Sequence, residues 1–213
     1  MKKGSFIVFE GIDGSGKTTQ VKLLEAFLVK SGRRVLTTRD PGSTALGEQL
    51  REVLLFSRHA IDPVAEALMY AAARAQYVSE SIRPGLREGR VVISDRFAAS
   101  LFAYQGWGKG VDLALLDMVN RHSCRDLAPD MTILLDIDPS AALSRLKRPA
   151  DRMEGEGREF LQRVRRGYLS MADGSPHRFR VIDAGLPEED IFAMVKSGEE
   201  EIRQEEIPVS RYI

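Results

Sequence analysis

Short apolar runs alternate with longer stretches along this chain, and in the longer stretches apolar residues recur every three or four positions. The short runs are rich in Val, Ile and Phe and predict β-strands at Ser5–Glu10, Arg33–Thr38, Arg90–Ser94, Met131–Ile137 and Phe179–Ile182. The periodic stretches predict helices at Lys17–Lys30, 44–56, 62–83, 112–122, 139–147, 156–173 and 187–205. Because helices separate strands that are apolar almost throughout, we expect an α/β fold with a parallel sheet covered on both faces.

The length of 213 residues is typical of one domain, and we expect a single unit over residues 1–213. The segment Lys147–Arg158 is polar and contains glycine, which is typical of a loop between two helices. We therefore expect a short lid at about residues 145–158.

The charges of the chain balance, with 31 Lys and Arg against 31 Asp and Glu. A neutral chain creates no overall field that would attract nucleic acid or an anionic membrane, so we expect neither as a partner. No window approaches the roughly 20 apolar residues of a membrane span. The single cysteine, Cys124, cannot form an internal disulfide, and no Cys/His cluster has zinc-site spacing, so we expect a cytoplasmic location.

One motif indicates specific chemistry. Residues 11–18 match G-x-x-x-x-G-K-[ST] in full, and they directly follow the first predicted strand and run into the start of the first predicted helix. In such a loop, backbone N–H groups converge on phosphate oxygens, Lys17 bridges the outer phosphates and the Thr18 hydroxyl can bind Mg²⁺. The sequence therefore predicts a nucleoside triphosphate site with these phosphate-binding residues: Gly11, Asp13, Gly14, Ser15, Gly16, Lys17, Thr18 and Thr19.

Basic residues near the predicted loops indicate the class of phosphate-loop protein. The only asparagine is Asn120, inside a predicted helix, so the N-K-x-D motif with which GTPases read guanine is absent. Each basic residue taken singly is typical of a solvated surface, but together they exceed what one ATP requires and suggest a nucleoside monophosphate acceptor. They are Arg39, Arg74, Arg96, Arg145, Lys147, Arg148 and Arg152.

Two acidic positions sharpen this expectation. A carboxylate inside a phosphate loop repels ATP, so Asp13 needs Mg²⁺ or a hydroxyl of a second substrate as its partner, unless it only caps the turn. Asp95 and Arg96 close the third predicted strand, at the sheet edge where open α/β folds bind ligands. The guanidinium there is suited to bidentate phosphate binding. We expect Asp95 to join Thr18 at Mg²⁺, directly or through water, with a structural ion pair as the alternative.

Over essentially its whole length the chain resembles the thymidylate kinases, which transfer the γ-phosphoryl group of ATP to dTMP in dTTP biosynthesis. Beyond the phosphate loop with its preceding Phe9-Glu10, the resemblance is carried by Arg39-Asp40-Pro41-Gly42-Ser43-Thr44, Ala71-Ala72-Ala73-Arg74, Asp95-Arg96-Phe97, Ala103-Tyr104-Gln105-Gly106 and Asp151-Arg152. It implies the fold of P-loop nucleoside monophosphate kinases, which is a three-layer α/β/α arrangement with a five-stranded parallel sheet. It also implies a homodimer formed by helix packing.

The same resemblance implies roles at the acceptor. Arg51 and Arg96 would hold the acceptor phosphate, while Tyr70 would stack on the thymine and Arg74 would bond its carbonyl; their four-residue spacing places Tyr70 and Arg74 on one helix face. Tyr104 would disfavour a 2′-hydroxyl on the sugar. The implied dTMP-binding set is Asp13, Asp40, Pro41, Arg51, Tyr70, Arg74, Arg96, Ser100, Tyr104 and Gln105.

Members of this family differ in whether the basic residue acting on the transferred phosphoryl group lies in the phosphate loop or in the lid. The loop here has Gly14 and Ser15 in place of an arginine, so the chain resembles the bacterial type with a basic lid: Arg145, Lys147, Arg148 and Arg152. We expect Arg152 to be the main contributor. The expected catalytic residues are then Lys17, Arg96, Arg152 and Asp13.

One departure concerns the base. The position after Ser100, which is small and polar in the family, is Leu101 here, and leucine can neither donate nor accept a hydrogen bond. Gln105 or a water would have to replace the contact. Two alternatives therefore stay open, a related kinase with a different or relaxed base preference and a non-catalytic nucleotide-binding module.

Overall fold

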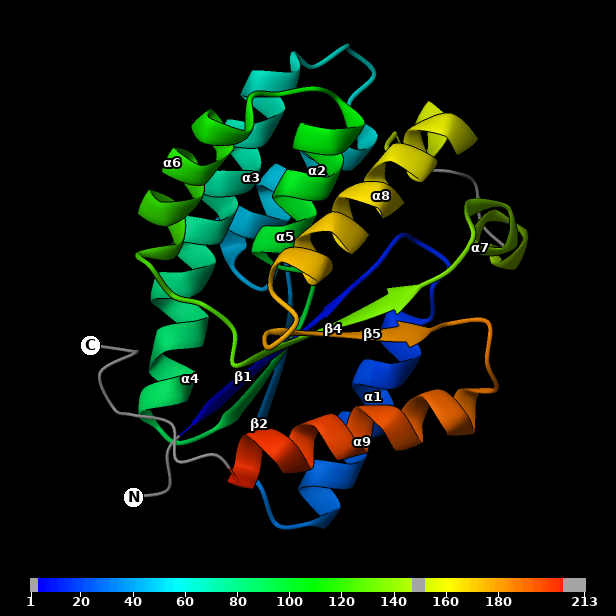
Figure 1. Ribbon diagram of the computed structural model, residues 1–213. Coiled ribbons are helices and arrows are strands. Elements are labelled where there is room, and N and C mark those ends of the chain that lie inside the picture. The colour runs from blue at the N-terminus through cyan, green and yellow to red at the C-terminus, as the bar shows by residue number, and fades with distance from the viewer. Residues whose placement is uncertain (1–3, 147–151, 205–213) are drawn as a thin grey trace.

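A parallel five-stranded sheet forms the centre of the protein (Figure 1). The computed structural model describes residues 4–146 and 152–204. The strand order is β2-β3-β1-β4-β5, and every neighbouring pair is parallel. The strands are β1 (Ser5–Glu10), β2 (Val35–Arg39), β3 (Val91–Asp95), β4 (Met131–Asp136) and β5 (Phe179–Asp183). The predicted strands are confirmed, with ends that differ by one or two residues.

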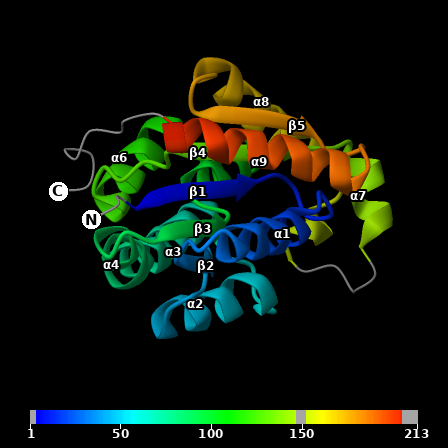
Figure 2. The same cartoon turned by 90° about the horizontal axis from the view of Figure 1, so that it is seen from below.

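Helices cover both faces of this sheet, so the three-layer α/β/α fold is confirmed. Helices α1 and α9 pack on one face, and the helices of the middle of the chain, together with α8, cover the other (Figures 1 and 2). Of the lid predicted at about 145–158, residues 147–151 lie outside the described part of the chain. The helical segments are α1 (Lys17–Lys30), α2 (Ala45–Phe56), α3 (Pro63–Tyr77), the π-helix η1 (Val78–Ile82), α4 (Arg83–Arg87), α5 (Ala98–Leu101), the π-helix η2 (Phe102–Gly108), α6 (Leu113–Cys124), α7 (Pro139–Arg145), the 3-10 turn η3 (Glu154–Glu156), α8 (Arg158–Gly174) and α9 (Glu188–Gln204).

The central strand β1 shows why the strands are apolar throughout. Its residues alternate between the two faces: Ile7 and Phe9 belong to the core cluster that includes Leu24 of α1, whereas Phe6 and Val8 belong to the cluster that packs under α3 and α4. All of these β1 side chains are buried. A strand buried on both faces cannot show the alternation of a half-exposed strand, which is why a continuous apolar run was the correct signal.

Two helical regions differ from the prediction. The helix expected at 62–83 continues as η1 and α4 to Arg87, past Pro84, because the widened π-turn directly before the proline accommodates its missing N–H. The second region, α5 with η2, was not predicted. It contains two glycines and three aromatic residues in eleven positions, so it lacks a clear helical period.

The π-helix η2 packs closely against α8 because each of the two helices has a glycine at the contact. A Cβ atom built on Gly167 of α8 would lie 2.6 Å from Cγ and 2.8 Å from Cβ of Trp107, and one built on Gly108 would lie 2.5 Å from the ring of Phe160. Both distances are shorter than van der Waals contact, so this interface requires glycine on each side. Within the described ranges, no helix has the length and apolar character needed to cross a membrane.

We expect Gly167→Ala to lower the free energy of unfolding by about 1–3 kcal/mol, because the added methyl group overpacks the contact with Trp107 near the backbone. Gly174→Ala is the matched control on the same helix, since a Cβ there meets nothing within 4 Å. Urea unfolding of the two variants measures the difference. Equal stabilities would contradict the close packing of η2 on α8.

Candidate active site

Two cavities open side by side at the carboxyl ends of the central strands. The larger, called the large cleft here, has a volume of about 820 Å³ and is lined by the phosphate loop, α1 and the ends of β2 and β3. The smaller, the narrow cavity, has a volume of about 80 Å³ and lies among α2, α3, α5 and η2. The residues that line both are Asp13, Asp40, Arg51 and Arg96, so the two cavities meet at these charged side chains.

The phosphate loop joins β1 to α1 at the floor of the large cleft. Gly14 has φ +84°, and a Cβ there would lie 2.2 Å from the carbonyl oxygen of Ala142, so only glycine fits. Gly16 is the N-cap residue of α1, which turns the positive end of that helix toward the cleft. Of the predicted phosphate-binding residues, Gly11 and Ser15 do not line the cleft. The Ser15 hydroxyl is buried without a hydrogen-bond partner in the described residues.

Lys17 lies folded back over this loop. Its Nζ donates to the carbonyl oxygens of Gly11 and Ile12, each at 3.0 Å, and lies 3.6 Å from the Asp13 carboxylate. Burial, together with the positive charge of Arg96, lowers the pKa of Lys17, while Asp13 opposes that shift. Among the described residues, Lys17 is held by two loop carbonyls and one carboxylate, contacts that an anion in the cleft could replace.

Thr18 and Asp95 supply oxygen atoms suited to Mg²⁺. The Thr18 hydroxyl donates to Oδ2 of Asp95 at 3.1 Å, and both residues line the large cleft. The residues that the structure describes hold no group of three or more metal-binding His, Cys, Asp or Glu side chains. Mg²⁺ in phosphoryl-transfer sites takes few protein ligands and completes its shell with phosphate oxygens and water, so this pair fits that ion.

Arg96 connects the loop to the end of β3. Its backbone has φ +72°, in the left-handed region, and its Nη2 donates to Oδ1 of Asp13 at 2.7 Å. Its Nη1 donates to the carbonyl oxygen of Gly11 at 2.9 Å, and the guanidinium lies 5.1 Å from the ring centre of Tyr104. Burial disfavours the charged guanidinium, but Asp13 and the neighbouring acids raise the pKa of Arg96. The cation is therefore fixed and charged where the two cavities meet.

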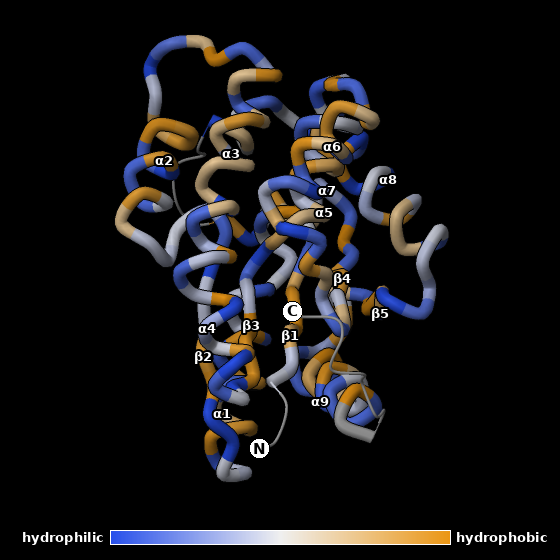
Figure 3. The backbone as a smooth tube through the Cα atoms, turned by 90° about the vertical axis from the view of Figure 1, so that its left-hand side faces the viewer, coloured by the Kyte–Doolittle hydropathy of each residue, from blue (hydrophilic) through white to orange (hydrophobic). Residues whose placement is uncertain are grey.

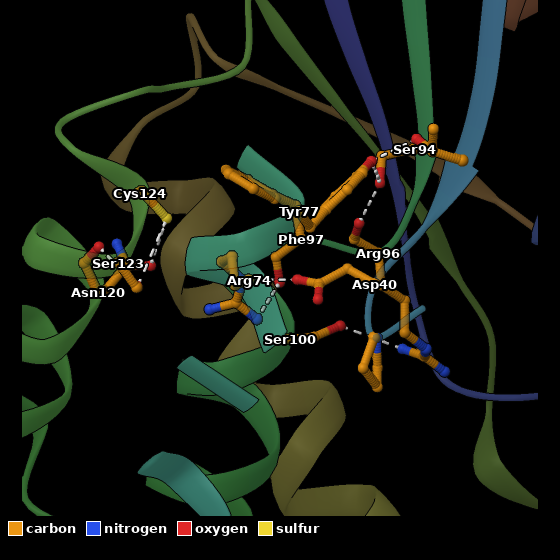
Figure 4. Close-up of polar contacts among 12 residues, drawn as sticks. Asp40, Arg74, Tyr77, Ser94, Arg96, Phe97, Ser100, Asn120, Ser123 and Cys124 are labelled. Carbon is orange, nitrogen blue, oxygen red and sulfur yellow. Dashed lines mark hydrogen bonds and ion pairs between the residues drawn. The ribbon is translucent and has the colours of Figure 1, made fainter. Parts of the chain in front are cut away.

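A second ion pair, which is fully buried, joins Arg74 on the wall of the narrow cavity to Asp40 at the junction (Figure 4). Nε of Arg74 donates to Oδ2 of Asp40 at 2.6 Å, and its Nη2 donates to the carbonyl oxygen of Phe97 at 3.2 Å. Nη1 of Arg74 is buried and has no hydrogen-bond partner in the described residues. The peptide bond between Asp40 and Pro41 is cis. The Asp40 carboxylate fixes the Arg74 guanidinium, while Nη1 keeps its hydrogen atoms for another acceptor. This arrangement is expected of a group that binds a ligand.

The narrow cavity brings together every residue that the resemblance implied for dTMP: Asp13, Asp40, Pro41, Arg51, Tyr70, Arg74, Arg96, Ser100, Tyr104 and Gln105. Charged groups lie at the end shared with the large cleft, where Arg51 donates to the carbonyl oxygen of Pro41 at 3.1 Å. Leu55, Leu101 and Met153 add apolar surface. The cavity thus has a charged end for an anion and a mostly apolar end with a few polar groups for a ring.

The lid arginines lie in different places. Arg145 lines the large cleft, and its Nη1 donates to the carbonyl oxygen of Ala184 at 2.9 Å. Arg152 does not line either cavity: its Nε donates to the carbonyl oxygen of Leu54 at 2.8 Å and its Nη2 pairs with the buried carboxylate of Glu66. The structure therefore does not bring Arg152 to the phosphate loop. Two further lid predictions lie outside the described residues, Lys147 and Arg148.

Glu10, for which no role was predicted, is fully buried at the end of β1. Its Oε1 accepts the N–H groups of Phe97 and Ser100, and its Oε2 accepts the hydroxyls of Ser100 at 2.6 Å and Tyr168 at 2.9 Å. Burial raises the pKa of Glu10, against the charge of Arg96. Because Ser100 and Tyr168 also accept hydrogen bonds from Arg96, Glu10 supports that guanidinium. In the sequence, the sign of such a role was a single acidic residue at the end of an apolar strand.

We expect Arg74→Met to lower the free energy of unfolding by about 3–5 kcal/mol, because it leaves the Asp40 carboxylate buried and without its cation. The double variant Arg74→Met/Asp40→Leu removes both charges and should lose less stability. The control is Arg39→Met in the exposed Arg39–Glu48 pair, with an expected cost below about 1 kcal/mol. Chemical denaturation measures all three, and a double variant no more stable than Arg74→Met would contradict the argument.

Comparison with known proteins identifies the family. A sequence model described as thymidylate kinase matches residues 9–195. The chain is 50% identical over 204 residues to the thymidylate kinase of Pelotomaculum thermopropionicum, covering 94% of each chain, and 45% identical over 200 residues to that of Thermoanaerobacter sp. (strain X514), covering 91% of this chain and 98% of the relative. The crystal structure of thymidylate kinase from Ehrlichia chaffeensis superposes with a TM-score of 0.77 at 36% identity, over 92% of this chain and 99% of that one. The chain belongs to the thymidylate kinase family.

Proposed function

We propose that the protein transfers the γ-phosphoryl group of ATP to dTMP, giving ADP and dTDP. The observation that carries this proposal is the junction of the two cavities at Asp13, Asp40, Arg51 and Arg96. Two phosphorylated ligands, one in each cavity, would meet at this junction with their phosphates facing each other. The identity to curated thymidylate kinases favours this function over the two alternatives, a kinase for another base and a non-catalytic module.

On the donor side, the phosphate loop and the start of α1 would hold the triphosphate of ATP in the large cleft. Lys17 would leave the loop carbonyls and bridge the outer phosphates. Thr18 and Asp95 would hold Mg²⁺, which when bound neutralises charge on the β- and γ-phosphates. Arg145, fixed by the carbonyl oxygen of Ala184, would lie along the nucleoside end of the cleft.

On the acceptor side, Arg51 and Arg96 would bind the phosphate of dTMP at the junction. Tyr70 would stack on the thymine, and the unused Nη1 of Arg74 would donate to one of its carbonyl oxygens. Tyr104 would lie under the deoxyribose, where its ring leaves little room for a 2′-hydroxyl. The shape and charge of the narrow cavity support this assignment, since its charged end is the one that adjoins the donor cleft.

The reaction requires no general base, because the acceptor is already an anionic phosphate. An oxygen of that phosphate attacks the γ-phosphorus, and the bond from the γ-phosphorus to the bridging oxygen of ADP breaks. Catalysis therefore depends on holding the two phosphates in line and on neutralising their combined charge. Lys17 and Arg96 would supply positive charge to these phosphates, and Asp13 restrains both side chains.

We also propose a homodimer and a cytoplasmic location. Apolar side chains lie exposed on neighbouring helices, among them Val53 and Phe56 on α2, Leu68 on α3 and Met118 on α6. Figure 3 shows hydrophobic stretches along the backbone of these three helices. A second copy of the chain could cover this surface by helix packing. Cys124 is buried and unpaired, as is common in a reducing compartment.

An acceptor assay with ATP, Mg²⁺ and a panel of nucleoside monophosphates tests the proposed activity. We expect dTMP to have the highest kcat/KM, with a reduced margin over dUMP and dGMP because Leu101 cannot bond the base. Lys17→Ala serves as the control and should lower kcat by about 10²-fold or more, since it removes a cation from the transferred phosphate. If dTMP is not the preferred acceptor, the substrate assignment is wrong.

A kinetic assay of Arg152→Ala tests the role of the lid. If Arg152 leaves Glu66 and reaches the transferred phosphoryl group during turnover, kcat should fall by about 10²-fold with little change in the KM for dTMP. That is the result we expect. A raised KM with unchanged kcat would instead show that Arg152 stays with Glu66 and contributes only to acceptor binding.

A further inference from the structure

Glu66 of α3 is a fully buried carboxylate with three donors, two from η2 and its C-cap and one from the segment before η3. Oε1 accepts a hydrogen bond from Nε2 of Gln105 in η2 at 2.8 Å. Oε2 accepts from Nζ of Lys109 at 3.3 Å and pairs with the guanidinium of Arg152. Glu66 does not line the narrow cavity, but Gln105 does.

The contact with Glu66 determines which way the Gln105 amide faces. A carboxylate only accepts hydrogen bonds, so the NH₂ end of the amide must point toward Glu66 and the carbonyl Oε1 is left as an acceptor. Gln105 is 1% exposed and lines the narrow cavity, so a ligand in that cavity could reach the acceptor. Leu101, on the wall of the same cavity, offers no polar group. Nearby, Nη1 of Arg74 is a buried donor without a partner in the described residues.

We propose that Glu66 is a positioning residue for base selectivity, which holds Gln105 so that its carbonyl accepts the N3–H of thymine while Arg74 donates to O4. An acceptor beside a donor matches thymine. Cytosine carries the reverse pattern, with an acceptor at N3 and an amino group at C4, and it would leave both protein groups unpaired. This inference deepens the proposed function and rests on it.

Glu66, rather than Gln105 alone, is required because the two ends of a glutamine amide have almost the same shape. A Gln105 side chain without a fixed partner could present either end to the base. In a Glu66→Gln variant, Lys109 and Arg152 would compete for the single remaining oxygen of residue 66. The amide nitrogen of residue 66 would then face Gln105 and favour the reversed orientation, with the NH₂ group toward the base.

The test compares dTMP with 5-methyl-dCMP, because both carry the 5-methyl group and differ only in the hydrogen-bonding pattern. We expect the wild-type enzyme to prefer dTMP by about 10²-fold or more in kcat/KM, and Glu66→Gln to reduce this preference by about tenfold or more. The loss should appear mainly as a raised KM for dTMP. The preference for dTMP over dUMP, which reports the methyl contact, should not change.

Three further variants separate this role from a purely structural one. Lys109→Met removes a different partner of Glu66 and should keep the wild-type preference. Glu66→Asp keeps the charge but draws the carboxylate back from Gln105, so it should lose selectivity even if Glu66→Gln fails to fold. In a Gln105→Leu background, changing Glu66 should have no further effect on the preference.

The outcomes distinguish the two proposals. If the wild-type enzyme phosphorylates dTMP and the folded Glu66 variants keep its full preference over 5-methyl-dCMP, the role of Glu66 is wrong and the kinase activity stands. If the wild-type enzyme does not phosphorylate dTMP, the proposed function itself is wrong. A loss of preference in Lys109→Met equal to that in Glu66→Gln would overturn the specific link through Gln105.

Discussion

The ion pair between Arg96 and Asp13 is the interaction on which the site depends. It joins the end of β3 to the phosphate loop after β1, and these two neighbouring strands are held in parallel register from Ser5 and Val91 to Phe9 and Asp95. The sheet thus sets the distance between the two elements, and the ion pair sets the direction of the guanidinium. Asp13 also lies near Lys17, so one carboxylate restrains the cations of both Arg96 and Lys17.

Restraint of this kind is what a phosphoryl-transfer enzyme needs before its substrates arrive. Two cations held close together repel each other, and the carboxylate between them lowers that cost while the junction is empty. When phosphates enter, they can take over the neutralising role that Asp13 and the loop carbonyls perform in the described structure. The positive charge is therefore preorganised, although the chain as a whole is neutral.

The layers of the fold and the phosphate loop could be predicted from the sequence, because their signals are local, whereas the acceptor residues were expected from the family resemblance. Apolar runs mark strands buried on both faces, and the glycines of the phosphate loop mark a backbone that only glycine permits, as at Gly14. Local signals do not reveal partners that are distant along the chain. The pairing of Glu66 with Gln105 spans 39 positions and that of Arg152 with Glu66 spans 86, so neither could be read from spacing. For the same reason the sequence predicted a basic lid but not where Arg152 lies.

The π-helix η2 carries Tyr104 and Gln105, which are adjacent in the chain and yet both line the narrow cavity. In a regular α-helix, successive residues point about 100° apart, and the wider π-turn reduces this separation. The number of residues between Ser100 and Lys109 must therefore stay the same for both side chains to face the cavity. Single substitutions there could alter which nucleotide fits, but loss of one residue would restore the α-helical turn and rotate Tyr104 and Gln105 away from each other. Over evolutionary time this segment should tolerate changes of side chain far better than changes of length.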